Sequence, residues 1–333
     1  MPRTASTFLH RLLASDAATR SPLLWEQDHN DFDVRPAKAG ELLTDRRIDV
    51  VKNAVYAIRL FSPNIIAEFF KFHVVGATDA EECTPFLRRY YWEMEAVGMS
   101  ATSLAKREAW LEDPKVDKNF VAQELKAWLA LHSDATAGVA GVAAGVEGGV
   151  GDSAGLSDGV SVARVRWVLK APMFTHFLRE LAQTFPDGLF VFTNRDVLDV
   201  IPSMCGLAEC LASIKLDYSD LSLLNKIGAV YVKRIAAYAR AQLDFFQDAP
   251  VGLLRKPLYL RYKDVLADPA LTLKGIYTAA DLDWTPAVDA AVAEQLTAAP
   301  QHQHGKPSYS LKKFGIDAKA VPTEFHTFAK TFL

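Results

Sequence analysis

The chain has 333 residues, of which half are apolar, 11% are aromatic and 23% are charged. This composition is typical of a folded chain that buries a substantial core, and it excludes disorder throughout. Lys and Arg number 37 against 40 Asp and Glu, and the resulting net charge of −3 argues against a nucleic-acid-coating protein. The length fits either two domains or one large α/β domain.

The cysteine count and the hydropathy argue against further classes of protein. Cys83, Cys205 and Cys210 are odd in number and form no Cys-x-x-Cys pair, so we expect reduced core thiols rather than a disulfide framework or a cysteine zinc site. No apolar run reaches the ~20 residues that a membrane-spanning helix needs. The start also lacks the features of a secretory signal, and the chain as given favours the cytoplasm.

The N-terminal segment predicts a turn that leads into a helix. Residues 2–7 read Pro-Arg-Thr-Ala-Ser-Thr, and the amphipathic segment 8–13 follows directly. Such a loop normally follows a strand, but only Met1 precedes it. We therefore expect that an N-terminal strand is missing, which leaves open a signal or anchor further upstream.

The next part of the chain predicts one short strand and then a helical layer. Residues 23–26 are apolar and end in an acid, which indicates a buried strand. Apolar residues recur three and four positions apart in the segments predicted as helices, which are 46–61, 64–74, 80–95 and 119–132. We interpret the aromatic residues of this layer as core residues, with ligand contact as the alternative: Phe69, Phe70, Tyr90, Tyr91 and Trp92.

Residues 134–160 form a segment of low complexity. They contain eight of the 18 glycines, and the rest is mostly Ala, Val, Ser and Asp. Such a segment cannot repay the entropy of ordering, so we expect a mobile insertion. A strand that needs a sheet follows it, which favours a loop within one domain over a linker between two.

The second half of the chain alternates strands and helices. Strands are predicted at 165–170, 189–193 and 258–262, with helices at 174–184 and 197–211. This alternation predicts a parallel sheet that is covered on both faces and binds its ligand at the carboxyl ends of the strands. Lys170, residues 194–196 and residues 262–264 lie at those ends.

The N-terminal loop is by itself a weak anion-binding signal. Its small and hydroxylic residues precede a helix and would offer N–H and hydroxyl groups to an anion. The alternative is an ordinary helix cap formed by Ser6 or Thr7. No Gly-x-x-x-x-Gly-Lys-Ser/Thr motif occurs anywhere in the sequence, so an ATPase or kinase of the P-loop type is disfavoured.

Together with the later segments, this loop resembles that of the sulfotransferases that use 3′-phosphoadenosine 5′-phosphosulfate. The similarity is greatest to the branch with Pro-Arg-Ser-Gly-Thr-Thr loops, related to tyrosylprotein and cytosolic sulfotransferases. The similarity lies in four blocks of the sequence, which occur in the same order as in the family. They are residues 2–13 with 20–26, residues 167–172, residues 192–203, and residues 260–269 with 304–315. The resemblance implies a three-layer α/β fold like that of P-loop NTPases, as one domain over residues 1–333. A central parallel sheet and a helical acceptor-side layer belong to that fold.

The resemblance also implies how the donor is bound. The loop residues would cradle the phosphosulfate at the start of the helix, and they are Arg3, Thr4, Ala5, Ser6 and Thr7. Arg195 and Ser203 would hold the ribose 3′-phosphate, because eight residues bring the serine about two helical turns along. Tyr262 would stack on adenine and Lys306 would close on the donor. The alternative for Tyr262 is an aromatic residue of the core, and the alternative for Lys306 is a solvated surface charge.

Three residues match the family's catalytic positions. Arg3 would stabilise the bridging oxygen, and Lys170 would neutralise the sulfuryl oxygens. Glu26 matches the base that takes the proton from the attacking hydroxyl, although a lone Glu is usually a solvated surface residue. This chemistry needs no metal, and a His-x-His pair at 302 and 304 is too little for a metal site.

Two departures from the family pattern lie in this loop, and one of them leaves an alternative function open. The family has Gly where this chain has Ala5, and Thr where it has Ser6. Gly permits close backbone approach or positive φ, so Ala5 favours the alternative of a degenerate nucleotide-binding protein without turnover. We expect the acceptor to be a small molecule or another hydroxylated compound that the sequence does not identify. We do not expect a nucleic acid as a partner. Residues expected to line its pocket are Phe69, Phe72, Tyr90 and Trp92. His73, His302 and His304 are further candidates, although isolated histidines are more often not site residues.

Overall fold

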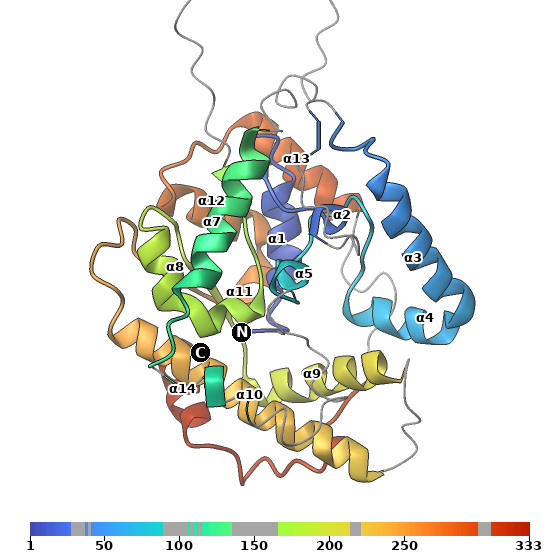
Figure 1. Ribbon diagram of the computed structural model, residues 1–333. Coiled ribbons are helices and arrows are strands. Elements are labelled where there is room, and N and C mark those ends of the chain that lie inside the picture. The colour runs from blue at the N-terminus through green and yellow to red at the C-terminus, as the bar shows by residue number, and fades with distance from the viewer. Residues whose placement is uncertain are drawn as a thin grey trace, which may run out of the picture.

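The structure is a computed structural model, shown in Figure 1. It describes residues 1–27, 37–38, 41–88, 106, 109–111, 113, 115–134, 166–213, 221–298 and 308–333. Several sequence predictions lie outside these residues: the insertion at 134–160 apart from Asp134, and the side chains of Tyr90, Tyr91, Trp92, His302, His304 and Lys306.

The first half of the described chain is mainly helical. Its elements are α1 (Ser6–Ala14), β1 (Thr19–Arg20), α2 (Leu24–Gln27), α3 (Arg47–Phe61), α4 (Pro63–Phe72), α5 (Thr84–Arg88) and α7 (Asn119–Asp134). The helices predicted at 46–61, 64–74 and 119–132 are thus confirmed within two residues. Of the helix predicted at 80–95, only α5 lies in the described residues, and it begins four residues later than expected.

The second half begins with short strands and contains the longest helix. Its elements are β2 (Arg166–Trp167), η2 (Pro172–Phe177), α8 (Leu178–Thr184), β3 (Val191–Asn194), α9 (Val197–Ala212), α10 (Leu221–Gln247) and β4 (Leu258–Arg261). They are followed by α11 (Tyr262–Ala267), α12 (Pro269–Ala279), α13 (Pro286–Ala298), η3 (Lys312–Phe314) and α14 (Glu324–Phe332). The predicted alternation of strands and helices is confirmed, with strands shorter than expected.

The strands form two parallel pairs. β1 pairs with β2, and β3 pairs with β4 so that Val191 lies opposite Leu258. Parallel strands with helices between them make an α/β architecture, as expected. Within the described residues, however, the two pairs are separate sheets and not one continuous central sheet.

Helices cover both faces of the β3–β4 pair, because successive side chains of a strand point to opposite faces. Val191, Leu258 and Leu260 pack with the core that α1, α12 and α13 share. From the other face, Phe192 packs with Phe245 of α10. The carboxyl end of β3 lies beside the start of α9, and this end carries the site described below (Figure 1).

The strand predicted at 23–26 is wrong, because residues 24–27 form helix α2. The Glu26 carboxylate accepts the backbone N–H of Leu23 at 2.8 Å, and the Glu26 N–H donates to the Leu23 carbonyl at 3.1 Å. The carboxylate bond is one half of a capping box, and the main-chain bond closes the helical turn. Leu23 keeps only an isolated antiparallel bridge to Ala80.

Helix α10 organises the largest core, and the sequence analysis did not predict it. Residues 227, 231, 235, 239 and 243 are Ile, Tyr, Ile, Ala and Leu, and all are buried at a four-residue spacing. This face packs with buried residues of α9 and α14. Gly228 lets η3 approach the helix, since a Cβ at this position would lie 2.1 Å from the Phe314 carbonyl oxygen.

Two further predictions concern the cysteines and the hydropathy of the helices. Cys83, Cys205 and Cys210 are buried free thiols, as expected. In the described part of the chain, no helix is both long and apolar enough to cross a membrane.

Candidate functional site

The loop before α1 has a strained backbone and is fixed to the end of β3. Arg3 has φ of 58° and Ala5 has φ of 64°, so both adopt the left-handed region that L-residues disfavour. The fully buried Thr4 hydroxyl donates to the Met1 carbonyl at 2.9 Å and lies 2.6 Å from the Thr193 hydroxyl. This bonding holds the loop at the N-terminus of α1, where anions are favoured.

The arginine and serine expected at the 3′-phosphate both contact this loop. Arg3 Nε donates to Ser203 Oγ on α9 at 3.0 Å, and Ser203 is 1% exposed. A longer bond of 3.4 Å joins Arg195 NH1 to the Arg3 carbonyl oxygen. The Arg195 guanidinium lies 4.6 Å from the centre of the Tyr262 ring. Two guanidinium groups, a buried hydroxyl and an aromatic ring therefore surround one end of the loop.

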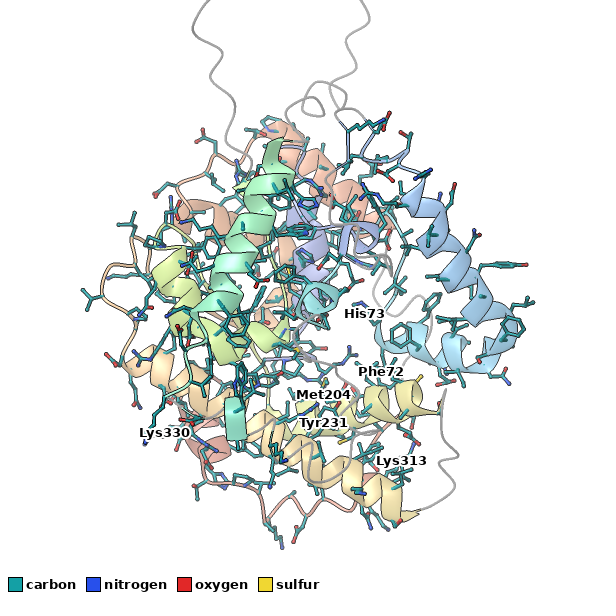
Figure 2. All side chains as sticks on the ribbon, viewed as in Figure 1. Phe72, His73, Met204, Tyr231, Lys313 and Lys330 are labelled. Carbon is teal, nitrogen blue, oxygen red and sulfur yellow. The ribbon has the colours of Figure 1, made fainter. Side chains whose placement is uncertain are left out.

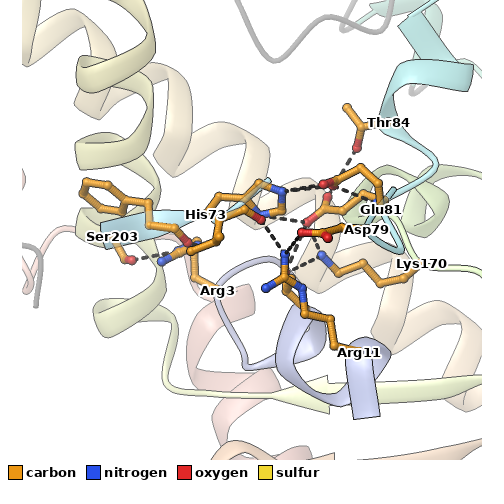
Figure 3. A network of polar contacts seen from close by, with 12 residues as sticks. Arg3, Arg11, His73, Asp79, Glu81, Thr84, Lys170 and Ser203 are labelled. Atoms are coloured by element: carbon orange, nitrogen blue, oxygen red, sulfur yellow. Dashed lines mark hydrogen bonds and ion pairs between the residues drawn. The ribbon is translucent and has the colours of Figure 1, made fainter. Parts of the chain in front are cut away.

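Lys170 lies at the other end of the loop, against Thr7. Its ammonium donates to Thr7 Oγ1 at 2.8 Å and forms an ion pair with the Glu82 carboxylate. Figure 3 shows Lys170 in the network of polar contacts that also includes His73 and Glu81. Burial alone would raise the pKa of Glu82, but Lys170 and His73 outweigh it and lower that pKa to about 2. A cation and a carboxylate thus meet beside the first turn of α1.

His73 joins a second carboxylate to this group. Its Nε2 lies 2.9 Å and 3.1 Å from the two Glu81 carboxylate oxygens, and its Nδ1 lies 4.0 Å from Glu82 Oε1. Burial opposes the charge on Glu81, but His73 lowers its pKa. The backbone N–H of Glu82 also donates to Glu81 Oε1 at 2.8 Å. His73, Glu81 and Glu82 therefore form one polar cluster.

The segment 72–74 connects α4 to the N-terminal loop. Arg3 NH1 donates to the Phe72 carbonyl oxygen at 2.9 Å, and Arg11 NH2 donates to that of Val74 at 2.5 Å. The Arg3 guanidinium also lies 5.5 Å from the centre of the Phe72 ring, and burial lowers the pKa of Arg3. Figure 2 shows Phe72 and His73 at the end of α4 that faces α9. The helical layer thus contacts the expected donor loop directly.

Glu26, the expected base, has different partners. Its carboxylate forms an ion pair with Arg20 and accepts the Leu23 N–H, and the residue is 2% exposed. Burial raises the pKa of Glu26 despite Arg20. No contact recorded among the described residues joins Glu26 to Lys170 or Thr7, whereas Glu82 contacts both.

Glu81 and Glu82 were not predicted as site residues from the sequence. Their only signal was two adjacent acids before the Thr84-Pro85 start of α5. Together with His73 they also have the spacing of a metal site, since their ligand atoms lie within 4.8 Å of one another. Each already has a protein partner, because Lys170 pairs with Glu82 and His73 bonds to Glu81. We therefore propose no metal ion here.

The remaining predicted residues lie on the same loop or outside the described chain. Ser6 is the first residue of α1, and Ala5 precedes it as the N-cap without a side-chain cap. Lys306 lies outside the described residues. The structure therefore brings together Arg3, Thr4, Ala5, Ser6, Thr7, Lys170, Arg195, Ser203 and Tyr262, and gives Glu26 other partners.

Comparisons with known proteins agree on one family. The model of the sulfotransferase family matches residues 1–286. The crystal structure of sulfotransferase STF9 from Mycobacterium avium is similar with a TM-score of 0.72 and 19% identity, over 100% of this chain and 75% of that one. The crystal structure of sulfotransferase STF1 from Mycobacterium tuberculosis H37Rv is similar with a TM-score of 0.59 and 21% identity, over 98% of this chain and 74% of that one. No curated protein matches the sequence.

Proposed function

Because the chain belongs to the sulfotransferase family, we propose that it transfers a sulfuryl group from 3′-phosphoadenosine 5′-phosphosulfate to a hydroxyl or amine of a small acceptor. The proposal includes a single domain with the three-layer fold of P-loop NTPases. The observation that carries it is the contact between the loop and both expected phosphate ligands. Arg3 bonds to Ser203 and, through its carbonyl oxygen, to Arg195.

The donor has an anion at each end, and the site offers cations at two places. The loop N–H groups, the start of α1 and Lys170 receive the phosphosulfate. Arg195 and Ser203 receive the 3′-phosphate, Tyr262 stacks on adenine, and Lys306 closes over the nucleotide. Arg195 Nε donates to the exposed Asp199 carboxylate at 3.4 Å, and a phosphate would replace this bond with a stronger charge-assisted one.

The catalytic step is an in-line displacement at sulfur. Negative charge builds up on the oxygen that bridges phosphorus and sulfur, and a fixed cation there lowers the barrier. Arg3 supplies this cation, and Lys170 neutralises the sulfuryl oxygens. Thr7 orients the Lys170 ammonium through its 2.8 Å bond. Positioning and charge suffice for this step, so the proposal includes no metal.

A transfer assay tests the proposal. The protein is incubated with donor that carries radioactive sulfur and with a panel of phenols, alcohols and amines, and labelled product is counted. We expect product from the wild type, and at least a hundredfold less from Lys170→Met, which removes the charge at the sulfuryl group. The matched control is Lys52→Met on the exposed face of α3, which keeps full activity. If 3′-phosphoadenosine 5′-phosphate binds but no acceptor or water is sulfonated, the degenerate binding protein is the correct description.

A further inference from the structure

Sulfuryl transfer to a hydroxyl also needs a group that takes the hydroxyl proton, and the best oriented one is His73. The inference rests on the proposed function and goes beyond it. A proton acceptor must lie beside the transfer site and must not be neutralised by a competing partner. In the described part of the chain, Glu26 contacts Arg20 and Leu23 and neither Lys170 nor Thr7, so it does not meet the first condition there.

Glu82 fails the second condition. Its carboxylate is ion-paired with Lys170 and also accepts the Thr7 and Thr84 hydroxyls at 3.4 Å and 3.3 Å. A carboxylate whose pKa is about 2 binds a proton poorly at neutral pH. The ion pair also balances the negative charge of Glu82, which would otherwise repel the negative sulfuryl group. We therefore assign to Glu82 the role of positioning Lys170.

His73 has the geometry of an oriented base. Both Glu81 oxygens lie within hydrogen-bond distance of Nε2 at 2.9 Å and 3.1 Å, and a carboxylate only accepts, so Nε2 carries the proton. The lone pair is then on Nδ1, which lies 4.0 Å from Glu82 Oε1 and thus on the side of Lys170 and Thr7. Among the described residues, the hydrogen bonds of the ring are those of Nε2 to Glu81, and Nδ1 makes none. A carboxylate that orients the ring through one nitrogen, while the other nitrogen can accept a proton, is the arrangement of catalytic histidines.

Two carboxylates flank the ring. Glu81 contacts it from one side and Glu82 from the other, and the edge of Phe69 packs on it with 6.0 Å between ring centres. The cations nearby are engaged elsewhere: Lys170 with Glu82, Arg3 with the Phe72 carbonyl, and Arg11 with the Val74 carbonyl. The last two bonds also fix the backbone on both sides of His73 to the donor loop and α1.

We infer that His73 is the catalytic base of sulfuryl transfer and that Glu81 is its positioning residue. The acceptor oxygen forms a bond to sulfur while the bond from sulfur to the bridging oxygen breaks. The electron pair of that bond stays on the 5′-phosphate of the leaving nucleotide. The proton of the acceptor hydroxyl passes to Nδ1 of His73, and solvent takes it from the ring after product release. Atoms and charge balance without any further reactant.

Chemical rescue tests the base directly. The probe reaction is sulfate release from labelled donor, with water as the acceptor. We expect His73→Ala to reduce kcat about a hundredfold or more and added imidazole to restore at least a tenth of it. Glu82→Ala loses activity that formate does not restore, and the control His326→Ala on α14 is unaffected. Rescue of Glu82→Ala by formate, together with no rescue of His73→Ala by imidazole, would overturn the proposal.

Two measurements keep the proposal separate from the proposed function and from misfolding. Calorimetry with 3′-phosphoadenosine 5′-phosphate is expected to give the same Kd, within about twofold, for wild type, His73→Ala and Glu81→Gln, whereas kcat falls in both variants. If the wild type does not bind the nucleotide, the proposed function itself has failed. Nitrogen NMR of labelled histidine, assigned by the signal lost in His73→Ala, reports the neutral tautomer without any turnover. A proton on Nε2 is expected, and a proton on Nδ1 would overturn the assignment.

Discussion

Arg3 and Ser203 lie 200 positions apart in the sequence, and a hydrogen bond of 3.0 Å joins Arg3 Nε to Ser203 Oγ. This bond connects the loop before α1 to the second turn of α9. The same guanidinium donates to the Phe72 carbonyl at the end of α4. Arg3 therefore joins the loop to both α9 and the end of α4. In the function that we propose, bound donor has to exchange some of these bonds for its own.

The strained loop provides the first prediction. Ala5 has φ of 64° and ψ of 16°, a conformation that costs an L-residue about 1 kcal/mol and costs glycine little. Ala5→Gly should therefore raise the free energy of unfolding by up to about 1 kcal/mol, measured by urea denaturation. The control is Ala54→Gly on the exposed part of α3, which should lower it by about 1 kcal/mol. A loss of stability in Ala5→Gly would show that the left-handed conformation is not strained.

The Lys170 to Glu82 ion pair predicts an acid-labile contribution to stability. The pKa of Glu82 is lowered from 4.5 to about 2 in the folded protein. A lowered folded-state pKa stabilises above the unfolded value, and the contribution is lost as the pH falls from about 4.5 to about 2. Urea midpoints across this range should decrease less steeply in Glu82→Gln than in wild type. The exposed Glu124→Gln is the control, and identical slopes for Glu82→Gln and wild type would exclude the ion pair as the cause.

Gly228 predicts a steric effect within the α10 core. A Cβ there would lie 2.1 Å from the Phe314 carbonyl oxygen, so backbone has to move. Gly228→Ala should cost about 2 kcal/mol or more in the free energy of unfolding. Gly275 of α12 has no atom within 4 Å of its added Cβ, so Gly275→Ala should instead stabilise by up to about 1 kcal/mol. Equal effects of the two substitutions would contradict the close approach of η3 to α10.

Glu26→Gln separates a structural carboxylate from a catalytic one. The substitution removes the charge that neutralises the buried Arg20, so the free energy of unfolding should fall by about 3 kcal/mol. The same variant should keep kcat within about tenfold of wild type under conditions where it is folded. Circular dichroism gives the folded fraction, and the labelled-donor assay gives kcat. A hundredfold loss of kcat with unchanged stability would restore Glu26 as the base that the resemblance implies.

Local sequence patterns predicted the framework and most of the loop. Arg195 and Tyr262 directly follow β3 and β4, which were visible as apolar runs, and parallel pairing brings the carboxyl ends of these two strands to the same side. The helices α3, α4, α7 and α9 were visible from their periodicity. α10 has the same signal, with Ile227, Tyr231, Ile235, Ala239 and Leu243 four residues apart, and was overlooked.

Pairings between distant segments were not predictable. Glu82 and Lys170 are 88 positions apart, and nothing local marks either as the other's partner. Leu23 to Glu26 has the composition of a strand, but one side-chain bond from Glu26 to the Leu23 N–H makes it a helical turn. His73 was one of several isolated histidines until the chain brought Glu81 to its Nε2.

The measurement that tests the donor site most directly compares two nucleotides that differ only in the 3′-phosphate. Calorimetry should show 3′-phosphoadenosine 5′-phosphate binding at least thirtyfold more tightly than adenosine 5′-phosphate, because charge-assisted bonds from Arg195 and a bond from Ser203 contribute about 2 kcal/mol. In Arg195→Ala this difference should fall below about threefold, and in the exposed control Arg179→Ala it should be unchanged. Equal affinity of the wild type for the two nucleotides, or binding of neither, would contradict a donor site formed by this loop and α9.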